Sequence, residues 1–263
     1  MYIPSRNIYF LHIQKTAGTS ITRWMEQVFL PEIRAAEPRS PSLSYFHQTQ
    51  ARGQLGKSVY FGHYGAYPLV HAPADLYCFT VLRDPVARTL SQIRHTARKQ
   101  SGRMHPVLMR HKTLLDFLHD PAAEAVLANV QTKSLLSDLM TPALRDYGPE
   151  LATIGSYFSV AALNWSEPSV KGHLLARLNG PISRVIFAEA LERGMQKVCA
   201  ELGLAGTPPV GRDNVSANEM AGLDDPAVLN RVREMNRLDQ MLYDLARERF
   251  ADTAPIATTH IAT

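Results

Sequence analysis

A short apolar run followed at once by a glycine-containing turn and a helix constrains this sequence more than any other feature. Residues 7–13 read NIYFLHI, are rich in β-formers and predict a buried strand. The turn at 14–18 leads into a helix that runs to about residue 29. Such a turn points several backbone N–H groups at one spot, and the helix N-terminus adds partial positive charge, so the pattern favours an anion site. An ordinary turn in which Thr19 or Ser20 caps the helix is the alternative.

Strand and helix patterns alternate along the rest of the chain. Further strands are predicted at 58–61, 76–82 and 184–188, and helices at 85–99, 113–139, 167–178, 190–202 and 226–250, with a loop at 31–42. Strands joined by helices predict an α/β fold, with a central parallel sheet flanked by helices. Because no repeat or flexible linker divides the chain, we expect one domain over residues 1–263, with a frayed tail from about residue 251.

The second motif stands where the strand at 76–82 ends. Arg83 follows this apolar strand directly, Pro85 suits the first turn of a helix, and Ser91 lies two turns along it beside Arg88. Open α/β sheets bind ligands at the carboxyl ends of their strands, which makes Arg83 a candidate ligand residue. The structural alternative is that Arg83 pairs with Asp84 or caps a loop.

The first turn is not a Walker A loop, because Lys15 precedes the glycine instead of following it. No second strand ends in a clear Asp metal ligand, so a site for a nucleoside triphosphate with Mg²⁺ is disfavoured and no metal is expected.

The composition excludes some classes of protein and does not itself define a function. The net charge of +4 is too small to predict a nucleic-acid partner, although Arg, the better residue for bidentate phosphate or sulfate binding, outnumbers Lys. Two cysteines far apart in the sequence predict no disulfide framework and fit a reducing compartment. No stretch approaches the roughly 18 apolar residues of a membrane span. We therefore expect a cytoplasmic protein without a membrane span.

Two segments together resemble PAPS-dependent sulfotransferases. HIQKTAGTS at 12–20 resembles the family's phosphosulfate loop, and VLRDPVARTLS at 81–91 resembles its 3′-phosphate motif. The nearest branch looks like the heparan sulfate 2-O- and 6-O-sulfotransferases and their bacterial relatives. Looser similarity extends to 129–133, 185–189, 212–216 and 242–250. The resemblance implies a P-loop-like nucleotide-binding fold.

The resemblance also implies roles for individual residues. Lys15 would hold the 5′-phosphosulfate together with the rest of the turn, which comprises Thr16, Ala17, Gly18, Thr19 and Ser20. Arg83 and Ser91 would bind the 3′-phosphate, and Arg212 and Asn214 would lie in a loop that closes over the nucleotide. The family transfers the sulfuryl group of PAPS in line to a hydroxyl or amine, leaves adenosine 3′,5′-bisphosphate and uses no metal.

A base must take the proton of the acceptor, and His63 follows a short strand and a glycine at the expected sheet edge. His47 and His71 stay open as alternatives, whereas His12 reads as structural. Two other functions also stay open, a small-molecule kinase on a related fold and a non-catalytic nucleotide-binding protein. The expected acceptor is a carbohydrate or a small metabolite, and the sequence defines neither its identity nor the oligomeric state.

Overall fold

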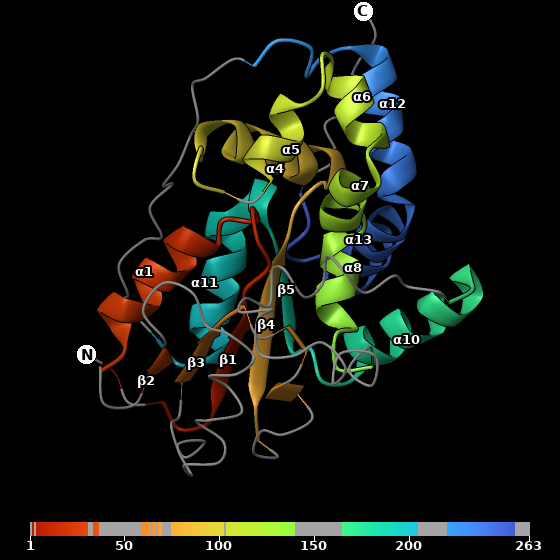
Figure 1. Ribbon diagram of the computed structural model, residues 1–263. Coiled ribbons are helices and arrows are strands. Elements are labelled where there is room, and N and C mark those ends of the chain that lie inside the picture. Colours follow the sequence, from red (N-terminus) through yellow and green to blue (C-terminus); the bar gives the residue numbers. More distant parts are fainter. Residues whose placement is uncertain are drawn as a thin grey trace, which may run out of the picture.

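Five parallel strands form the centre of the computed structural model (Figure 1). The structure describes residues 2, 4–30, 34–36 (backbone only), 59–63, 65–66, 68–69, 75–102, 104–139, 165–204 and 220–255. The strands are β1 (Ile8–Leu11), β2 (Arg34–Ala36), β3 (Val59–Gly62), β4 (Tyr77–Leu82) and β5 (Arg184–Phe187), in the order β2-β3-β1-β4-β5. The parallel pairing confirms the predicted α/β class with a central parallel sheet.

Helices cover both faces of the sheet. Ile8 and Phe10 point to the face covered by α1 (Gly18–Val28) and α11 (Leu191–Glu201). Tyr9 and Leu11 point to the opposite face, which is covered by α8 (Val130–Leu135), α10 (Glu167–Asn179) and α13 (Arg237–Arg249) (Figure 1). Burial on both sides explains why these strands read as continuous apolar runs rather than alternating ones.

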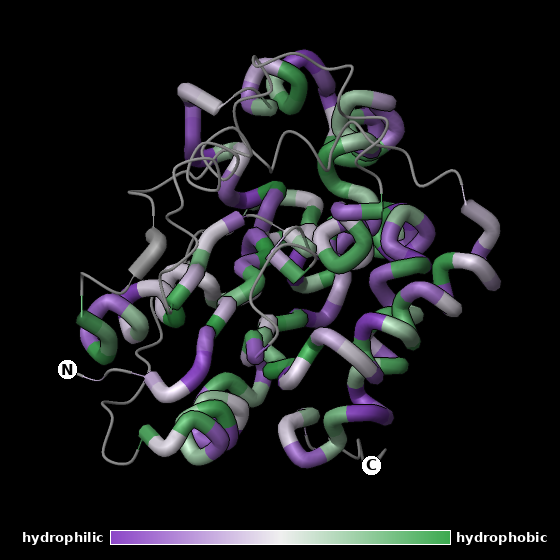
Figure 2. Tube along the Cα trace, turned by 90° about the horizontal axis from the view of Figure 1, so that it is seen from below, coloured by the Kyte–Doolittle hydropathy of each residue, from purple (hydrophilic) through white to green (hydrophobic). Residues whose placement is uncertain are grey.

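A further group of helices lies beyond the carboxyl ends of the strands (Figure 1). It consists of α4 (Pro85–Arg98), α5 (His105–Met109), α6 (Leu114–His119), α7 (Pro121–Leu127) and α12 (Pro226–Met235), which share a hydrophobic cluster of their own. Hydrophobic and hydrophilic stretches alternate along the helical tubes, as amphipathic packing requires (Figure 2). Among the described residues, no helix combines the length and apolarity needed to cross a bilayer.

Two helices predicted as single elements are interrupted. The segment 113–139 forms α6, α7 and α8, because Asp120 ends one helix and caps the next through the Ala122 amide, and Asn129 takes a left-handed conformation with φ of 52°. The segment 226–250 breaks at Asn236, whose side-chain amide donates to the Val232 carbonyl at 2.8 Å. Local capping and backbone conformation override the helical periodicity at these points.

Other local expectations also need correction. Strand β2 lies inside the segment 31–42 that the prolines mark as a loop. Helix α1 begins after Ala17, which is left-handed with φ of 69°, and no side chain caps it, so neither Thr19 nor Ser20 is the cap. Strand β1 ends at Leu11, which places His12 just beyond the strand instead of inside it.

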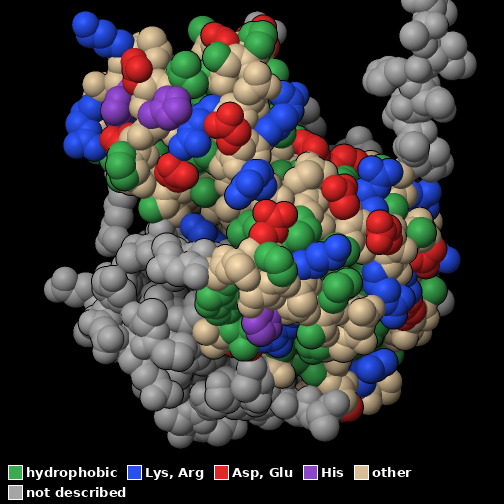
Figure 3. Space-filling view, turned by 90° about the vertical axis from the view of Figure 1, so that its right-hand side faces the viewer, with side chains coloured by type: hydrophobic (Ala, Val, Ile, Leu, Met, Phe, Trp, Pro, Cys, Tyr) green, Lys and Arg blue, Asp and Glu red, His purple; other side chains and the backbone are tan. Residues whose placement is uncertain are grey.

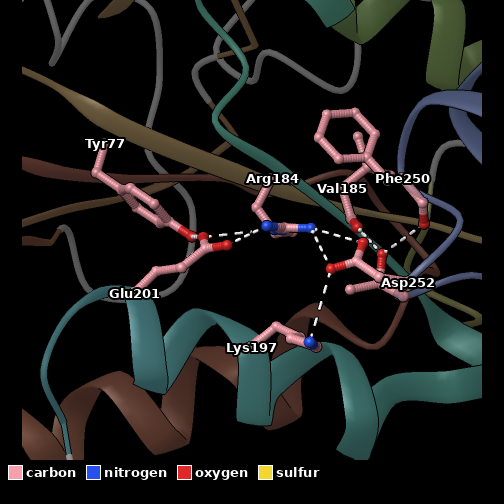
Figure 4. A network of polar contacts seen from close by, with 8 residues as sticks. Tyr77, Arg184, Val185, Lys197, Glu201, Phe250 and Asp252 are labelled. Atoms are coloured by element: carbon pink, nitrogen blue, oxygen red, sulfur yellow. Dashed lines mark hydrogen bonds and ion pairs between the residues drawn. The ribbon is translucent and has the colours of Figure 1, made fainter.

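The segment after α13 is held in place at the edge of the sheet where β4 and β5 begin. Arg184 at the start of β5 contacts Glu201 on α11 and donates to Asp252 at 2.8 Å (Figure 4). Thr253 is fully buried and donates to the Val185 carbonyl at 2.7 Å. Asp252 and Thr253 therefore have partners in the sheet and on α11, within the segment that the sequence predicts to fray.

Candidate functional site

Strand order brings the two sequence motifs to one edge of the sheet. Strand β1 lies between β3 and β4, with Leu11 level with Gly62 on one side and with Thr80 on the other. The turn after β1, His63 after β3 and Arg83 after β4 therefore leave the sheet side by side. The chain leaves β1 toward β2 on one side and leaves β4 toward β5 on the other, and open α/β sheets form their ligand sites at such a point.

The turn between β1 and α1 has an unusual backbone. Lys15 and Ala17 both take left-handed conformations with φ of 69°. Thr16 is fully buried, and its hydroxyl donates to the Ile13 carbonyl at 2.9 Å, so this hydroxyl stabilises the turn. The turn therefore delivers the chain directly into the first turn of α1, where Gly18 and Ser20 are buried and Thr19 is exposed.

A glycine is required at position 18 because the side chain of His12 approaches it closely, and not because of its backbone angles. A Cβ atom at this position would lie 1.6 Å from Nε2 of His12 and 2.0 Å from its Cδ2. The imidazole of His12 therefore packs directly over the start of α1. The same ring stacks on Phe10, with centroids 5.3 Å apart, and lies against the ring of His63, with centroids 4.0 Å apart.

The hydrogen bonding of His63 defines its tautomer. Its Nδ1 lies 2.9 Å from the backbone carbonyl oxygen of His12. Because a carbonyl oxygen only accepts, Nδ1 carries the proton and Nε2 of the neutral ring is the acceptor. Burial lowers the pKa of His63, although the bond to the His12 carbonyl opposes this. Burial, together with His63, lowers the pKa of His12 well below 6.5. The neutral form of both rings is favoured.

Cations gather around the turn. The Nη1 atom of Arg83 donates to the Lys15 carbonyl at 3.3 Å, which joins the two motifs directly. The pKa of Lys15 is lowered by burial and then by Arg98, Arg83 and Arg88. The pKa of His95 is lowered by burial and then by Lys15, Lys99 and Arg98. Every charged group that shifts either pKa is a cation. A bound anion would reduce the repulsion among these cations.

Helix α4 contributes a polar face to this cluster. Ser91, His95 and Arg98 follow one another at intervals of four and three residues and so share one side of the helix. Ile93, nearly opposite, is buried in the cluster with α5, α6, α7 and α12. By contrast, basic and acidic side chains are interspersed on the face of the molecule toward α10 and α12 (Figure 3).

The neighbours of Arg83 have structural partners. Asp84 caps α4 by accepting from the Ala87 amide at 2.8 Å, so it serves the helix instead of pairing with Arg83. Arg88 is buried and donates to the Leu127 carbonyl at 2.9 Å. Glu189 accepts from the Asp84 amide at 2.8 Å and from the Tyr243 hydroxyl at 3.1 Å. Arg83 is therefore the candidate anion ligand of this segment.

The sequence analysis missed the roles of His95 and Arg98 in the cation cluster and the contact of His12 with Gly18. His95 and Arg98 continue the spacing of Ser91 along the helix, which is a signal that periodicity could have given. The contact of His12 with Gly18 carried no such signal, because it depends on the path of the turn.

Arg212, Asn214, His47 and His71 lie outside the described residues. Within the described part of the chain, no group of three or more His, Cys, Asp or Glu side chains is placed to hold a metal ion.

No known family matches this sequence, and no curated protein does. Among solved structures, the crystal structure of a sulfotransferase from Alicyclobacillus acidocaldarius is similar, with 15% sequence identity over 95% of each chain and a TM-score of 0.39. The α/β class rests on the strand pairing itself.

Proposed function

We propose that this protein is a PAPS-dependent sulfotransferase. The observation that carries the proposal is the hydrogen bond from Arg83 to the Lys15 carbonyl, which brings together cations from the carboxyl ends of β1 and β4. A donor with a 5′-phosphosulfate and a 3′-phosphate presents two anionic groups, and this cluster offers cations on two separate elements. The likeness of both motifs to the family supports the same assignment.

In this proposal the turn binds one end of the donor, and Arg83 together with α4 binds the other end. Lys15, with the turn residues Thr16–Ser20, holds the phosphosulfate through its ammonium group, the backbone amides and the N-terminus of α1. Arg83 and Ser91 hold the 3′-phosphate. Arg212 and Asn214 are proposed to close over the nucleotide.

Lys15 has the further task of stabilising charge. As the bond between sulfur and the bridging oxygen breaks, negative charge grows on that oxygen. An ammonium group held there stabilises the transition state more than the ground state, which is what raises turnover.

His63 is proposed as the base. Its Nε2 is the acceptor of the neutral ring, and the lowered pKa keeps it neutral near pH 7. It would take the proton of the acceptor hydroxyl or amine as the new bond to sulfur forms. A carbohydrate or small metabolite in the cytoplasm is the proposed acceptor, with the whole chain acting as one domain.

Ligand-induced thermal shifts test the nucleotide assignment. Adenosine 3′,5′-bisphosphate should raise the melting temperature at concentrations where ATP with Mg²⁺ does not. Arg83→Ala should weaken PAPS about 10- to 100-fold, because charge-assisted hydrogen bonds are lost, and leave adenylyl sulfate almost unchanged. Equal losses for both ligands would make Arg83 structural.

Turnover tests the base. His63→Ala should lose about 10²- to 10⁴-fold in turnover while it still binds nucleotide. The wild-type rate should also fall below pH 6.5 as His63 takes up a proton, and the residual activity of the variant should lack this decline. A folded variant with more than about a tenth of the wild-type turnover would remove His63 from the mechanism.

A further inference from the structure

Gln131 makes two hydrogen bonds to the backbone of Arg83. Its Oε1 accepts from the Arg83 amide at 2.9 Å, and its Nε2 donates to the Arg83 carbonyl at 2.9 Å. Gln131 lies in α8 and is fully buried. One side chain thus contacts both polar groups of the residue that is proposed to bind the 3′-phosphate.

The two hydrogen bonds from Gln131 lie directly after the last paired residue of β4. The pairing of β4 with β1 ends at Thr80, and its pairing with β5 ends at Leu82. Arg83 is the next residue, so no neighbouring strand fixes its backbone. A carboxamide has the donor and acceptor of a peptide group and can therefore replace a strand at this position.

A buried carboxylate holds the backbone of Gln131. Asp239 on α13 is fully buried and accepts from the amides of Gln131 at 3.1 Å and Thr132 at 2.7 Å. It thereby satisfies backbone donors at the start of α8. These bonds fix where Gln131 leaves the helix.

Asn129 and Asn236 tie the same helix ends together. The Asn129 side chain accepts from the backbone amides of Leu238 at 3.0 Å and Asp239 at 3.3 Å, and the backbone amide of Asn129 donates to the Asn236 side chain at 3.0 Å. The left-handed conformation of Asn129 makes this reciprocal contact possible. The start of α8 is therefore anchored to α13.

We propose that Gln131 is a positioning residue for Arg83: its carboxamide fixes the Arg83 backbone so that the guanidinium group stays beside Lys15 and reads the 3′-phosphate. This inference rests on the proposed function. It assigns a physical role to the segment 129–133. Asn129 anchors α8 to α13, and Gln131 connects α8 to the backbone of Arg83 at the proposed nucleotide site.

Discrimination between two nucleotides tests the role. The measured quantity is the ratio of the affinities for adenosine 3′,5′-bisphosphate and adenosine 5′-monophosphate, which differ only in the 3′-phosphate. Gln131→Glu keeps the shape but places an oxygen against the Arg83 carbonyl, and Gln131→Met removes both hydrogen bonds. Both variants should lower the ratio about 5- to 20-fold, with monophosphate affinity within about twofold of wild type. Gln240→Met, at an exposed glutamine on α13, is the matched control and should leave the ratio unchanged.

The outcomes separate this inference from the proposed function. A wild-type ratio near one, or an unchanged ratio in Arg83→Ala, refutes the assignment of Arg83 and the inference with it. A reduced ratio in Arg83→Ala with a wild-type ratio in both Gln131 variants overturns the inference alone. An equal loss of both nucleotides in the Gln131 variants also overturns it, because that result reflects general damage to the fold.

Hydrogen exchange of the wild-type protein needs no variant. The Arg83 amide should exchange as slowly as the amides inside β4 if the carboxamide replaces a strand. Rapid exchange of the Arg83 amide would contradict its hydrogen bond to the Gln131 side chain.

Discussion

Gly18→Ala should disturb the site through a single added methyl group. The new Cβ would lie 1.6 Å from Nε2 of His12, far inside any non-bonded contact distance, so the imidazole must move. This movement separates it from the His63 ring, 4.0 Å away between centroids, and from Phe10. Overpacking of this kind costs about 1–3 kcal/mol. A cost near 2 kcal/mol lowers the melting temperature by about 4–8 °C in a chain of this size.

A double-mutant cycle isolates the cause. In a His12→Ala background the methyl group meets no ring, and alanine is a better helix former than glycine, so Gly18→Ala should then be neutral or slightly stabilising. The coupling free energy between the two positions should therefore be about 1–3 kcal/mol, measured by denaturant unfolding of the four proteins. An equal destabilisation by Gly18→Ala in both backgrounds would refute the steric explanation.

Three further predictions concern Lys15, the two histidines and Thr253. Lys15→Met should reduce turnover about 100-fold or more with a smaller change in bisphosphate affinity, measured by kinetics and calorimetry; wild-type turnover with poor affinity would contradict the proposed role. The folded-state pKa values of His12 and His63 lie below 6.5, so the unfolded chain binds more protons and stability should fall as the pH drops below 6.5. Unfolding of a variant with both histidines changed to Gln should depend less on pH over this window. Thr253→Val should cost about 1–2 kcal/mol by leaving the Val185 carbonyl without its donor, and an unchanged unfolding midpoint would count against that bond.

Much of the fold could be predicted because its signals are local. The strands β1, β3, β4 and β5 and the helices α1 and α4 follow from apolar runs, glycine and proline in the sequence. The two motifs lie on neighbouring strands, since β1 pairs with β4. Lys15 and Arg83 meet for this reason.

The remainder depends on contacts between distant residues. Ala17 is left-handed although alanine has no preference for that conformation, so the turn and its neighbours impose it. The carboxamide of Gln131 reaches Arg83 across 48 positions, and Asp239 reaches Gln131 across 108. No periodicity encodes such pairs. The helix breaks at Asn129 and Asn236 belong to the same set of contacts, which explains why hydropathy alone predicts longer helices there.

The anchoring of α8 on α13 has a consequence for how this protein folds. All five strands precede position 190, but Gln131 is fixed only after α13 has emerged and docked. Closing a loop of 108 residues is slow, since chain entropy is lost before the contact forms. We expect the sheet to gain protected amides early during refolding and the capacity to bind nucleotide to appear last, as a separate late phase. A chain interrupted before position 237 would therefore lack an ordered Arg83.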